Sequence, residues 1–310
     1  MSDKVLEAPA KWSDTGGRAR VFSGHESFAI RYGWLPKLHE AITADPQVFT
    51  SDERAILALG LGRNMVKSIR FWGDAFGLTR QAGRKVVPTE FADRLFAADG
   101  RDPFLEDPDS LWRLHWNLTV HAGLGAWVAI FQEIQDSEIT RERLIDLLRA
   151  RAETGRGPIT VGTATAHADM LIRTYAPSAS EGAAVAEETL GCPLQELGLI
   201  TMGISGGKPV LRFTRGARPS LASGAFAYAL HDFWLGTAPT SRMLSTRSLL
   251  LDRRSPGVIF RMDENTLQEH LEALCGACRS LSLQEDGVGG LNLVADEATM
   301  NELENIAWAK

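Results

Sequence analysis

Residues 50–96 constrain the fold most strongly, because helical and strand patterns follow one another there in a definite order. Wound at 3.6 residues per turn, residues 63–76 place Met65, Ile69, Trp72 and Phe76 in one apolar stripe. The charged side chains of this segment fall on the opposite face, and these are Arg63, Lys67, Arg70 and Asp74. The pattern predicts a helix that packs on a core by one face and presents cations by the other.

A β-hairpin is predicted directly after this helix. Gly77 tolerates the left-handed conformation that ends helices, and the pattern predicts strands at residues 78–80 and 85–87 around a polar turn. Helices are also predicted at residues 35–42, after a cap at Thr50 or Ser51, and at residues 89–96. This order is typical of a winged helix, which commonly puts its second helix in a DNA groove and its wing on the phosphate backbone. Winged helices also dock proteins, so both alternatives remain open.

Composition restricts how such a protein can bind nucleic acid. The 310-residue chain is 44% hydrophobic and 23% charged, with a net charge of −6 and a pI near 5.7. This balance is typical of a globular protein and argues against non-specific coating of nucleic acid, which needs a broadly basic surface. Between residues 54 and 85, however, seven cations face only one acid. Any nucleic-acid contact is therefore predicted to use this local patch.

The location of the protein in the cell is predicted from the absence of membrane-spanning and signal-peptide patterns in the sequence. No run approaches the ~20 apolar residues of a membrane span, and the first residues lack the apolar core of a signal peptide. Three cysteines are too few, and odd in number, for a disulfide framework, which favours a reducing compartment. We therefore expect a cytoplasmic protein that does not enter the membrane.

The helix-then-hairpin pattern recurs along the chain. It appears at residues 196–213 and again at residues 278–294. We therefore predict an α+β, mainly helical fold with repeated winged-helix-like units and short β-hairpin wings. The predicted units are a flexible tail (1–20), an N-terminal winged-helix domain (21–118), a helical helix-turn-helix segment (119–176), a second winged-helix-like unit (177–236) and a C-terminal α/β unit (237–310). In the last unit, residues 249–252 are predicted as an apolar strand.

Two groups of side chains are candidates for contact with DNA. In the first unit they are Arg63, Asn64, Lys67, Arg70, Arg84 and Lys85. In the second unit they are Lys208, Arg212 and Arg215, where alternating basic residues suit a phosphate backbone. An ordinary solvent-exposed hairpin explains the second group equally well.

Residues 21–36 combine aromatic and ionisable side chains at unusual density for a surface loop. His25 and Glu26 are the residue types that bind metals or move protons, and Arg31 can hold an anion. In the simpler alternative, the aromatics plug the domain and Glu26 pairs with Arg31. The residues alone leave both interpretations open.

A second candidate site lies in the run DPFLEDPD at residues 102–109. Asp102, Glu106 and Asp107 offer oxygen ligands of the kind that Mg²⁺ prefers, and they form the best metal candidate in the chain. Capping of the apolar helix that follows is the alternative, especially for Asp109. His115 lies further along that helix and is either a proton carrier or a hydrogen-bonded core histidine.

Several common motifs are missing. The sequence contains no GxxxxGK[ST], GxGxxG or GxSxG motif and no paired CxxC with zinc-finger spacing. ATP hydrolysis, dinucleotide chemistry, the usual hydrolase elbow and structural zinc are therefore disfavoured. No signature of a common nuclease fold is present either.

Five longer motifs give a family resemblance. They are FSGHESFAIRYGWLPK from Phe22, LGLGRNMVKSIRFWGDAFGL from Leu59, DPFLEDPDSLWRLHWNL from Asp102, CPLQELGLI from Cys192 and RPSLASGAFAYALHDFW from Arg218. In these motifs the chain resembles the SspB-type, DNA-nicking components of bacterial single-stranded DNA phosphorothioation defence systems. The resemblance extends over nearly all of the chain after residue 20.

The resemblance implies a function, and residue chemistry supplies candidate roles for it. The family opens one DNA strand so that partners can replace a non-bridging phosphate oxygen by sulfur, and those partners are a cysteine desulfurase, an ATPase and a sulfurtransferase-like protein. We hypothesise that Glu26 with Asp102, Glu106 and Asp107 holds Mg²⁺ or Mn²⁺. His25 or His115 would then move the proton, and Arg31 would steady the phosphate. A non-catalytic DNA-binding or docking subunit is the alternative, and a homodimer is possible.

Overall fold

The computed structural model describes residues 21–155, 157–177, 191–287 and 289–309, and the predicted tail lies outside them. Within these residues the chain is an α+β protein, mainly helical, with three small antiparallel sheets. No helix in the described part is both long and apolar enough to cross a bilayer.

The N-terminal part has the predicted order of elements. It contains α1 (Trp34–Ala44), η1 (Val48–Thr50), α2 (Asp52–Leu59), α3 (Arg63–Ala75), β1 (Thr79–Ala82), β2 (Lys85–Pro88) and α4 (Glu90–Phe96). The Ser51 hydroxyl accepts a hydrogen bond from the Arg54 amide and so caps α2. Gly77, with φ 71°, follows the end of α3. Strand β1 begins one residue and ends two residues later than predicted, and β2 begins as predicted and ends one residue later. Gly83, with φ 63°, lies in the turn between them.

Helix α3 has the predicted two faces. Ile69, Trp72 and Phe76 are fully buried, whereas Met65 is only partly buried. The opposite face, with its charged side chains, is exposed. Gly73 is required where α3 crosses α1, because a Cβ atom there would lie 2.3 Å from a Leu38 methyl group. This close packing fixes the direction in which the basic face points.

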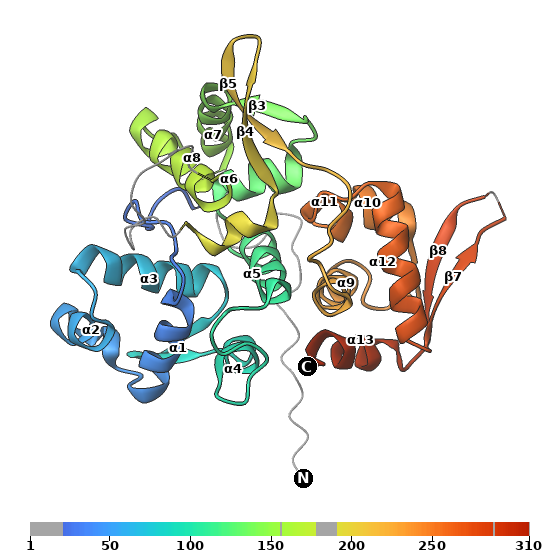
Figure 1. Ribbon diagram of the computed structural model, residues 1–310, viewed down its shortest axis with the longest axis horizontal. Coiled ribbons are helices and arrows are strands. Elements are labelled where there is room, and N and C mark those ends of the chain that lie inside the picture. Colours follow the sequence, from blue (N-terminus) through green and yellow to red (C-terminus); the bar gives the residue numbers. More distant parts are fainter. Residues whose placement is uncertain (1–20, 156, 178–190, 288, 310) are drawn as a thin grey trace.

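The middle of the chain packs around one long buried helix. Its elements are α5 (Pro108–Val120), α6 (Gly125–Val128), η2 (Ala129–Glu133), β3 (Glu138–Thr140), α7 (Arg141–Gly155), α8 (Val161–Tyr175), η4 (Pro193–Leu197), β4 (Ile200–Ser205) and β5 (Lys208–Phe213). Every residue of α5 from Asp109 to Val120 is buried, and α5 lies near the centre of the molecule (Figure 1). Strand β3 pairs with β5, so residues on both sides of the predicted boundary at residue 176 share one sheet.

The C-terminal part forms a separate lobe of the same chain. It contains α9 (Ser223–Thr237), β6 (Met243–Ser245), α10 (Thr246–Leu251), α11 (Pro256–Ile259), α12 (Glu264–Ala277), β7 (Leu281–Glu285), β8 (Leu291–Ala295) and α13 (Thr299–Trp308). The strand predicted at residues 249–252 is wrong, because most of this run belongs to helix α10. Ser245 caps that helix by accepting a hydrogen bond from the Ser248 amide.

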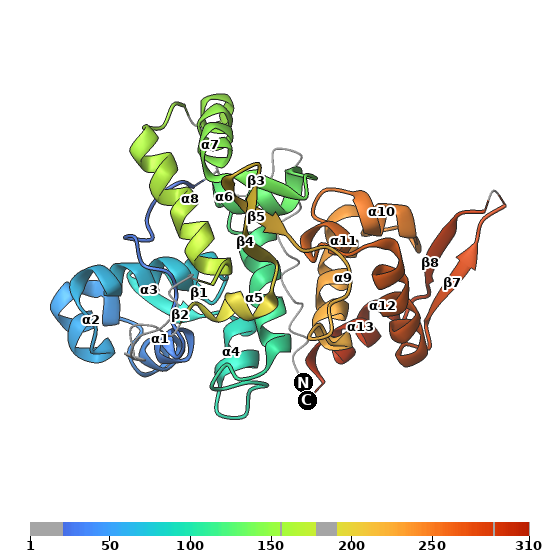
Figure 2. The same ribbon diagram turned by 45° about the horizontal axis from the view of Figure 1, so that its top comes forward.

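The two ends of the molecule are far apart. Helix α3 and the β7–β8 hairpin lie on opposite sides of α5 in both ribbon views (Figures 1 and 2). A buried ion cluster connects α5 to the C-terminal lobe. Asp109 contacts the Arg113 guanidinium at 2.5 Å and the Arg101 guanidinium at 3.1 Å, and it accepts a hydrogen bond from the Ala225 amide at the start of α9. Arg113 also donates to the Ala307 carbonyl of α13.

Candidate nucleic-acid interface

A concave basic surface lies between α3 and the first hairpin. Lys67 and Arg70 of α3 and Arg80 of β1 line the concavity, and all three side chains are exposed. Phe71 and Thr79 also line it and are more deeply placed. Cations along a helix and along the adjacent strand, with an aromatic ring between them, suit a phosphate backbone and the sugars or bases beside it.

Few of these cations are neutralised within the protein. Arg63 makes an exposed ion pair with Asp52 at 3.1 Å, and the Arg70 guanidinium lies 5.4 Å from the centre of the Phe49 ring. Lys67 and Arg80 have no ion pair with any carboxylate in the described part of the chain. An external anion can therefore approach these two without displacing an internal partner.

The predicted contact residues at the two ends of this surface are also exposed. Asn64 lies in the first turn of α3, whereas Arg84 and Lys85 lie at the turn of the hairpin beside Gly83. The first group of predicted DNA contacts thus spans one continuous segment of helix and hairpin.

A strained loop packs against the same helix. Gly24, Glu26 and Ser27 have φ values of 113°, 48° and 60°, which side-chain-bearing residues rarely adopt. The Phe28 carbonyl holds the loop on α3 by accepting hydrogen bonds from Ser68 Oγ at 3.1 Å and Trp72 Nε1 at 2.9 Å. A Cβ atom at position 24 would lie 2.8 Å from the Phe71 ring, so only glycine fits there.

His25 anchors this loop from inside. It is 4% exposed, its ring packs edge-on against Phe71, and its Nδ1 accepts a hydrogen bond from the Ser27 amide at 3.2 Å. Its Nε2 lies 3.5 Å from Nδ1 of His167 in α8, and the two rings stack. Burial, with a contribution from Arg173, lowers the pKa of His25. This geometry favours a structural role for His25, and its predicted proton transfer stays a prediction.

Glu26 is exposed, as are its loop neighbours Ser23, Gly24 and Ser27. The alternative ion pair between Glu26 and Arg31 is not formed among the described side chains, and Arg31 is half-buried at the end of the loop. Arg173 of α8 donates to the Ser27 carbonyl at 3.2 Å and adds an exposed cation beside Glu26. The structure thus brings His25, Glu26 and Arg31 into one loop adjoining the basic helix.

The acidic run at residues 102–107 forms a cap. The Asp102 carboxylate accepts hydrogen bonds from the amides of Glu106 and Asp107, at 2.8 and 3.0 Å. Asp107 accepts from the Asp109 amide and pairs with Arg101. Asp107 is therefore the N-cap of α5, and Asp102 bonds the turn before that helix. Capping of α5 by Asp109 was wrong, because its carboxylate binds Arg113 and the Ala225 amide instead.

No candidate metal centre is evident in the described ranges. They contain no group of three or more His, Cys, Asp and Glu side chains placed to hold an ion. The proposed ligands Glu26, Asp102, Glu106 and Asp107 are thus not gathered at one point, and they do not fit a shared Mg²⁺ or Mn²⁺ ion in this conformation.

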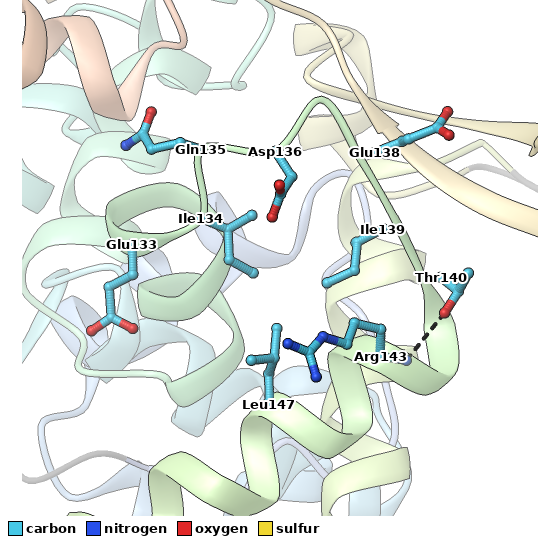
Figure 3. Close-up of a pocket in the computed structure, with 9 residues that line it drawn as sticks. All are labelled: Glu133, Ile134, Gln135, Asp136, Glu138, Ile139, Thr140, Arg143 and Leu147. Atoms are coloured by element: carbon cyan, nitrogen blue, oxygen red, sulfur yellow. Dashed lines mark hydrogen bonds between the residues drawn. The ribbon is translucent and has the colours of Figure 1, made fainter.

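A second concavity, between η2, β3 and α7, is rich in carboxylates. Figure 3 shows Glu133 and Glu138 pointing away from one another, with Asp136 and Arg143 between them. Glu133 pairs with Arg253 at 3.0 Å, and Glu138 pairs with Arg212 at 3.3 Å. The carboxylates therefore do not converge, and the concavity offers no metal site.

His115 is a core histidine. It is fully buried, its Nδ1 lies 2.7 Å from the Tyr175 hydroxyl, and its Nε2 lies 3.1 Å from the Ile259 carbonyl. The carbonyl can only accept, so Nε2 carries the proton and the Tyr175 hydroxyl donates to Nδ1. Burial lowers the pKa of His115 to about 3. This geometry favours the core alternative over proton transfer to DNA.

The second hairpin is less available for binding than the first. Arg212 pairs with Glu138 and donates to the Ile204 carbonyl at 2.8 Å. Arg215 donates to Gln135 Oε1 at 3.1 Å and to the Met262 carbonyl. Lys208, beside the turn, remains exposed. The alternative of an ordinary hairpin thus gains weight for Arg212 and Arg215.

Among the described residues, two histidine–carboxylate pairs were missed by sequence reasoning, His39 with Asp93 and His121 with Asp232. Asp232 of α9 is buried and accepts hydrogen bonds from Trp116 Nε1 and His121 Nε2, both at 2.8 Å. Although burial opposes it, the contact with His121 lowers the pKa of Asp232. His121 and Asp232 lie 111 positions apart, so no local signal could have revealed that pair.

Known proteins match this chain over nearly its whole length, in sequence and in fold. A family model described as "Protein of unknown function (DUF4007)" matches residues 22–306. An SspB crystal structure superposes with a TM-score of 0.81 and 31% sequence identity, covering 93% of this chain and 87% of that chain. The chain belongs to the DUF4007 family and to the structural family of SspB.

A second structure in this family was solved with an ion. A magnesium ion-bound SspB crystal structure has a TM-score of 0.81 and 30% identity, covering 94% of this chain and 89% of that chain. No curated protein matches the chain. The family resemblance predicted from the five sequence motifs is thereby confirmed.

Proposed function

We propose that the protein is the DNA-binding component of a bacterial DNA phosphorothioation system and that it binds DNA through α3 and the first hairpin. The observation that supports this most directly is the row of exposed cations formed by Lys67, Arg70 and Arg80. The relation to SspB supports the assignment to such a system. Its partners there would be the cysteine desulfurase, the ATPase and the sulfurtransferase-like protein.

The proposed interface explains how an acidic protein binds a polyanion. The net charge of −6 repels DNA at long range, but the cations on α3 and β1 lie together on one surface. Phosphate contacts by these residues release counterions, and this release drives binding at low salt. Phe71, at the base of the concavity, is placed to contact a sugar or base.

Removing both Lys67 and Arg80, as Lys67→Ala with Arg80→Ala, is expected to weaken DNA binding and reduce its salt dependence. Each lost phosphate contact lowers the slope of log K against log salt by about 1, so the double variant should lose roughly 2. Fluorescence anisotropy with labelled duplex at several salt concentrations measures this slope. Arg279→Ala, an exposed arginine after α12, is the matched control and should leave the slope unchanged.

An unchanged slope in the double variant, or an equal loss in Arg279→Ala, would place the DNA elsewhere on the protein. Single-stranded oligonucleotides in the same assay decide which form of DNA is preferred. Equal binding of both forms would indicate recognition of the backbone alone.

DNA nicking is the second candidate function, favoured by the strained loop that presents Glu26 beside the basic helix. The magnesium ion bound to a structural relative makes a divalent ion the first condition to test. Conversion of supercoiled plasmid to open circles in Mg²⁺ or Mn²⁺, but not in EDTA, is the expected result.

Glu26→Gln is expected to abolish this conversion while leaving duplex binding intact. Glu40→Gln, an exposed glutamate on α1, is the control variant and should nick at the wild-type rate. Wild-type nicking by the Glu26→Gln protein would remove this loop from the reaction. Absence of nicking under every condition, with binding retained, would leave a DNA-binding subunit whose chemistry belongs to its partners.

A further inference from the structure

A groove in the C-terminal lobe is unrelated to the proposed DNA interface. It has a volume of about 540 Å³ and lies between α10, α12 and the β7–β8 hairpin. Along its wall, α12 contributes Glu264, Leu267, Gln268 and Leu271. These positions have the spacing i, i+3, i+4 and i+7, so one face of α12 follows the groove for two turns.

The groove has an apolar lining that is partly exposed. Leu267 and Leu271 are almost completely buried and form its floor. Leu250 and Leu291 are half-buried in its walls, and Leu251 at the end of α10 is 51% exposed. Large aliphatic side chains that line a concavity and remain exposed are typical of a binding surface.

The charges on α12 and on the β7–β8 hairpin, which form two walls of the groove, restrict what it can bind. Helix α12 carries three glutamates, and the segment from β7 to β8 carries Glu285 and Asp286. Neither segment contains a lysine or an arginine in its sequence, and Arg247 of α10 is the cation that lines the groove. Glu264 and Asp286 line the groove itself, and the other three carboxylates lie on the same two segments outside its lining, so a phosphate backbone is disfavoured here. These carboxylates attract a cationic ligand that also has an apolar face.

We propose that this groove binds a basic amphipathic helix of a partner protein. The apolar stripe of such a helix would lie on the partly exposed Leu250, Leu251 and Leu291. Its lysine or arginine flanks would face Glu264 of α12 and Asp286 of the hairpin. A helix presenting residues at i, i+3, i+4 and i+7 matches the two turns of α12 that line the groove. The site lies at the end of the molecule opposite α3, so a partner bound there leaves the basic surface open (Figure 1).

The test uses the full chain and a synthetic peptide. The peptide has leucines at i, i+3, i+4 and i+7 with lysines on both flanks, and fluorescence anisotropy measures its binding. A second peptide keeps the leucines and replaces the lysines by glutamates. We expect saturable binding of the basic peptide, weakened by salt, and at least tenfold weaker binding of the acidic one.

Leu251→Ser is expected to weaken binding of the basic peptide roughly tenfold, because it removes an apolar contact. Leu57→Ser changes a leucine of α2 that is 84% exposed, and it should bind the peptide as the wild type does. Circular dichroism confirms that both variants fold. The proposal is overturned if the basic peptide fails to bind, if the acidic peptide binds equally well, or if Leu251→Ser and Leu57→Ser behave alike.

Discussion

Replacing Asp109 by Asn is expected to lower the free energy of unfolding by about 3–5 kcal/mol, the usual cost of removing one partner from a buried ion pair. Arg113 is fully buried, and its 2.5 Å contact with Asp109 is the ion pair that offsets its loss of hydration. Without that carboxylate, Arg113 and Arg101 would carry like charges side by side. Urea unfolding monitored by tryptophan fluorescence measures the loss.

Asp107→Asn is the matched control for this variant. Asp107 is in the same loop and caps α5, but its side chain is 42% exposed and Asn is an equally good cap. Its effect should therefore stay below about 1 kcal/mol. Equal losses in the two variants would show that the loop, and not the buried ion cluster, determines stability.

Acidification is expected to destabilise the protein well above the pH at which carboxylates protonate. Burial lowers the pKa of His167 and of His115 to about 3, whereas both ionise near 6.5 in the unfolded chain. Below pH 6.5 the unfolded chain therefore binds protons that the native protein does not. The stability present above pH 6.5 is lost as the pH falls toward 3, at about 1.4 kcal/mol per pH unit for each histidine.

His167→Phe tests this expectation directly. His167 packs among the rings of Phe22, Trp127 and His25, and its Nε2 is buried without a hydrogen-bond partner in the described structure, so a phenyl ring suits the site. Between pH 6.5 and 4.5 the free energy of unfolding of the variant should fall less steeply with pH than that of the wild type. The difference in slope should be the contribution of one histidine, about 1.4 kcal/mol per pH unit. Parallel curves for the two proteins would show that His167 binds its proton in the native state as well.

Local rules predicted the elements that depend on neighbouring residues. Ser51, Gly77 and the hairpin after α3 follow from capping, glycine conformation and alternation, which operate over a few positions. The predicted strand at residues 249–252 failed because a short apolar run suits a strand and a buried helix equally. The deciding feature, the cap at Ser245, precedes that run.

Candidate site residues were harder to predict, because their roles depend on distant partners. His115 is bound by Tyr175 and by the Ile259 carbonyl, which are 60 and 144 positions away. The charged face of α3 could be predicted without knowledge of distant partners, because all of its residues lie on one helix. A clustering of carboxylates in sequence was equally compatible with a helix cap, and Asp107 forms one.

The exposed face of α3 is mostly basic, the surfaces of α12 and the β7–β8 hairpin carry carboxylates, and the two regions lie on opposite sides of α5 (Figures 1 and 2). Near a polyanion this local difference in charge favours an approach with the basic face of α3 leading. The acidic side then faces the solvent, where the proposed partner helix would bind. Raising the ionic strength screens this attraction, and it should therefore slow association more than it speeds dissociation.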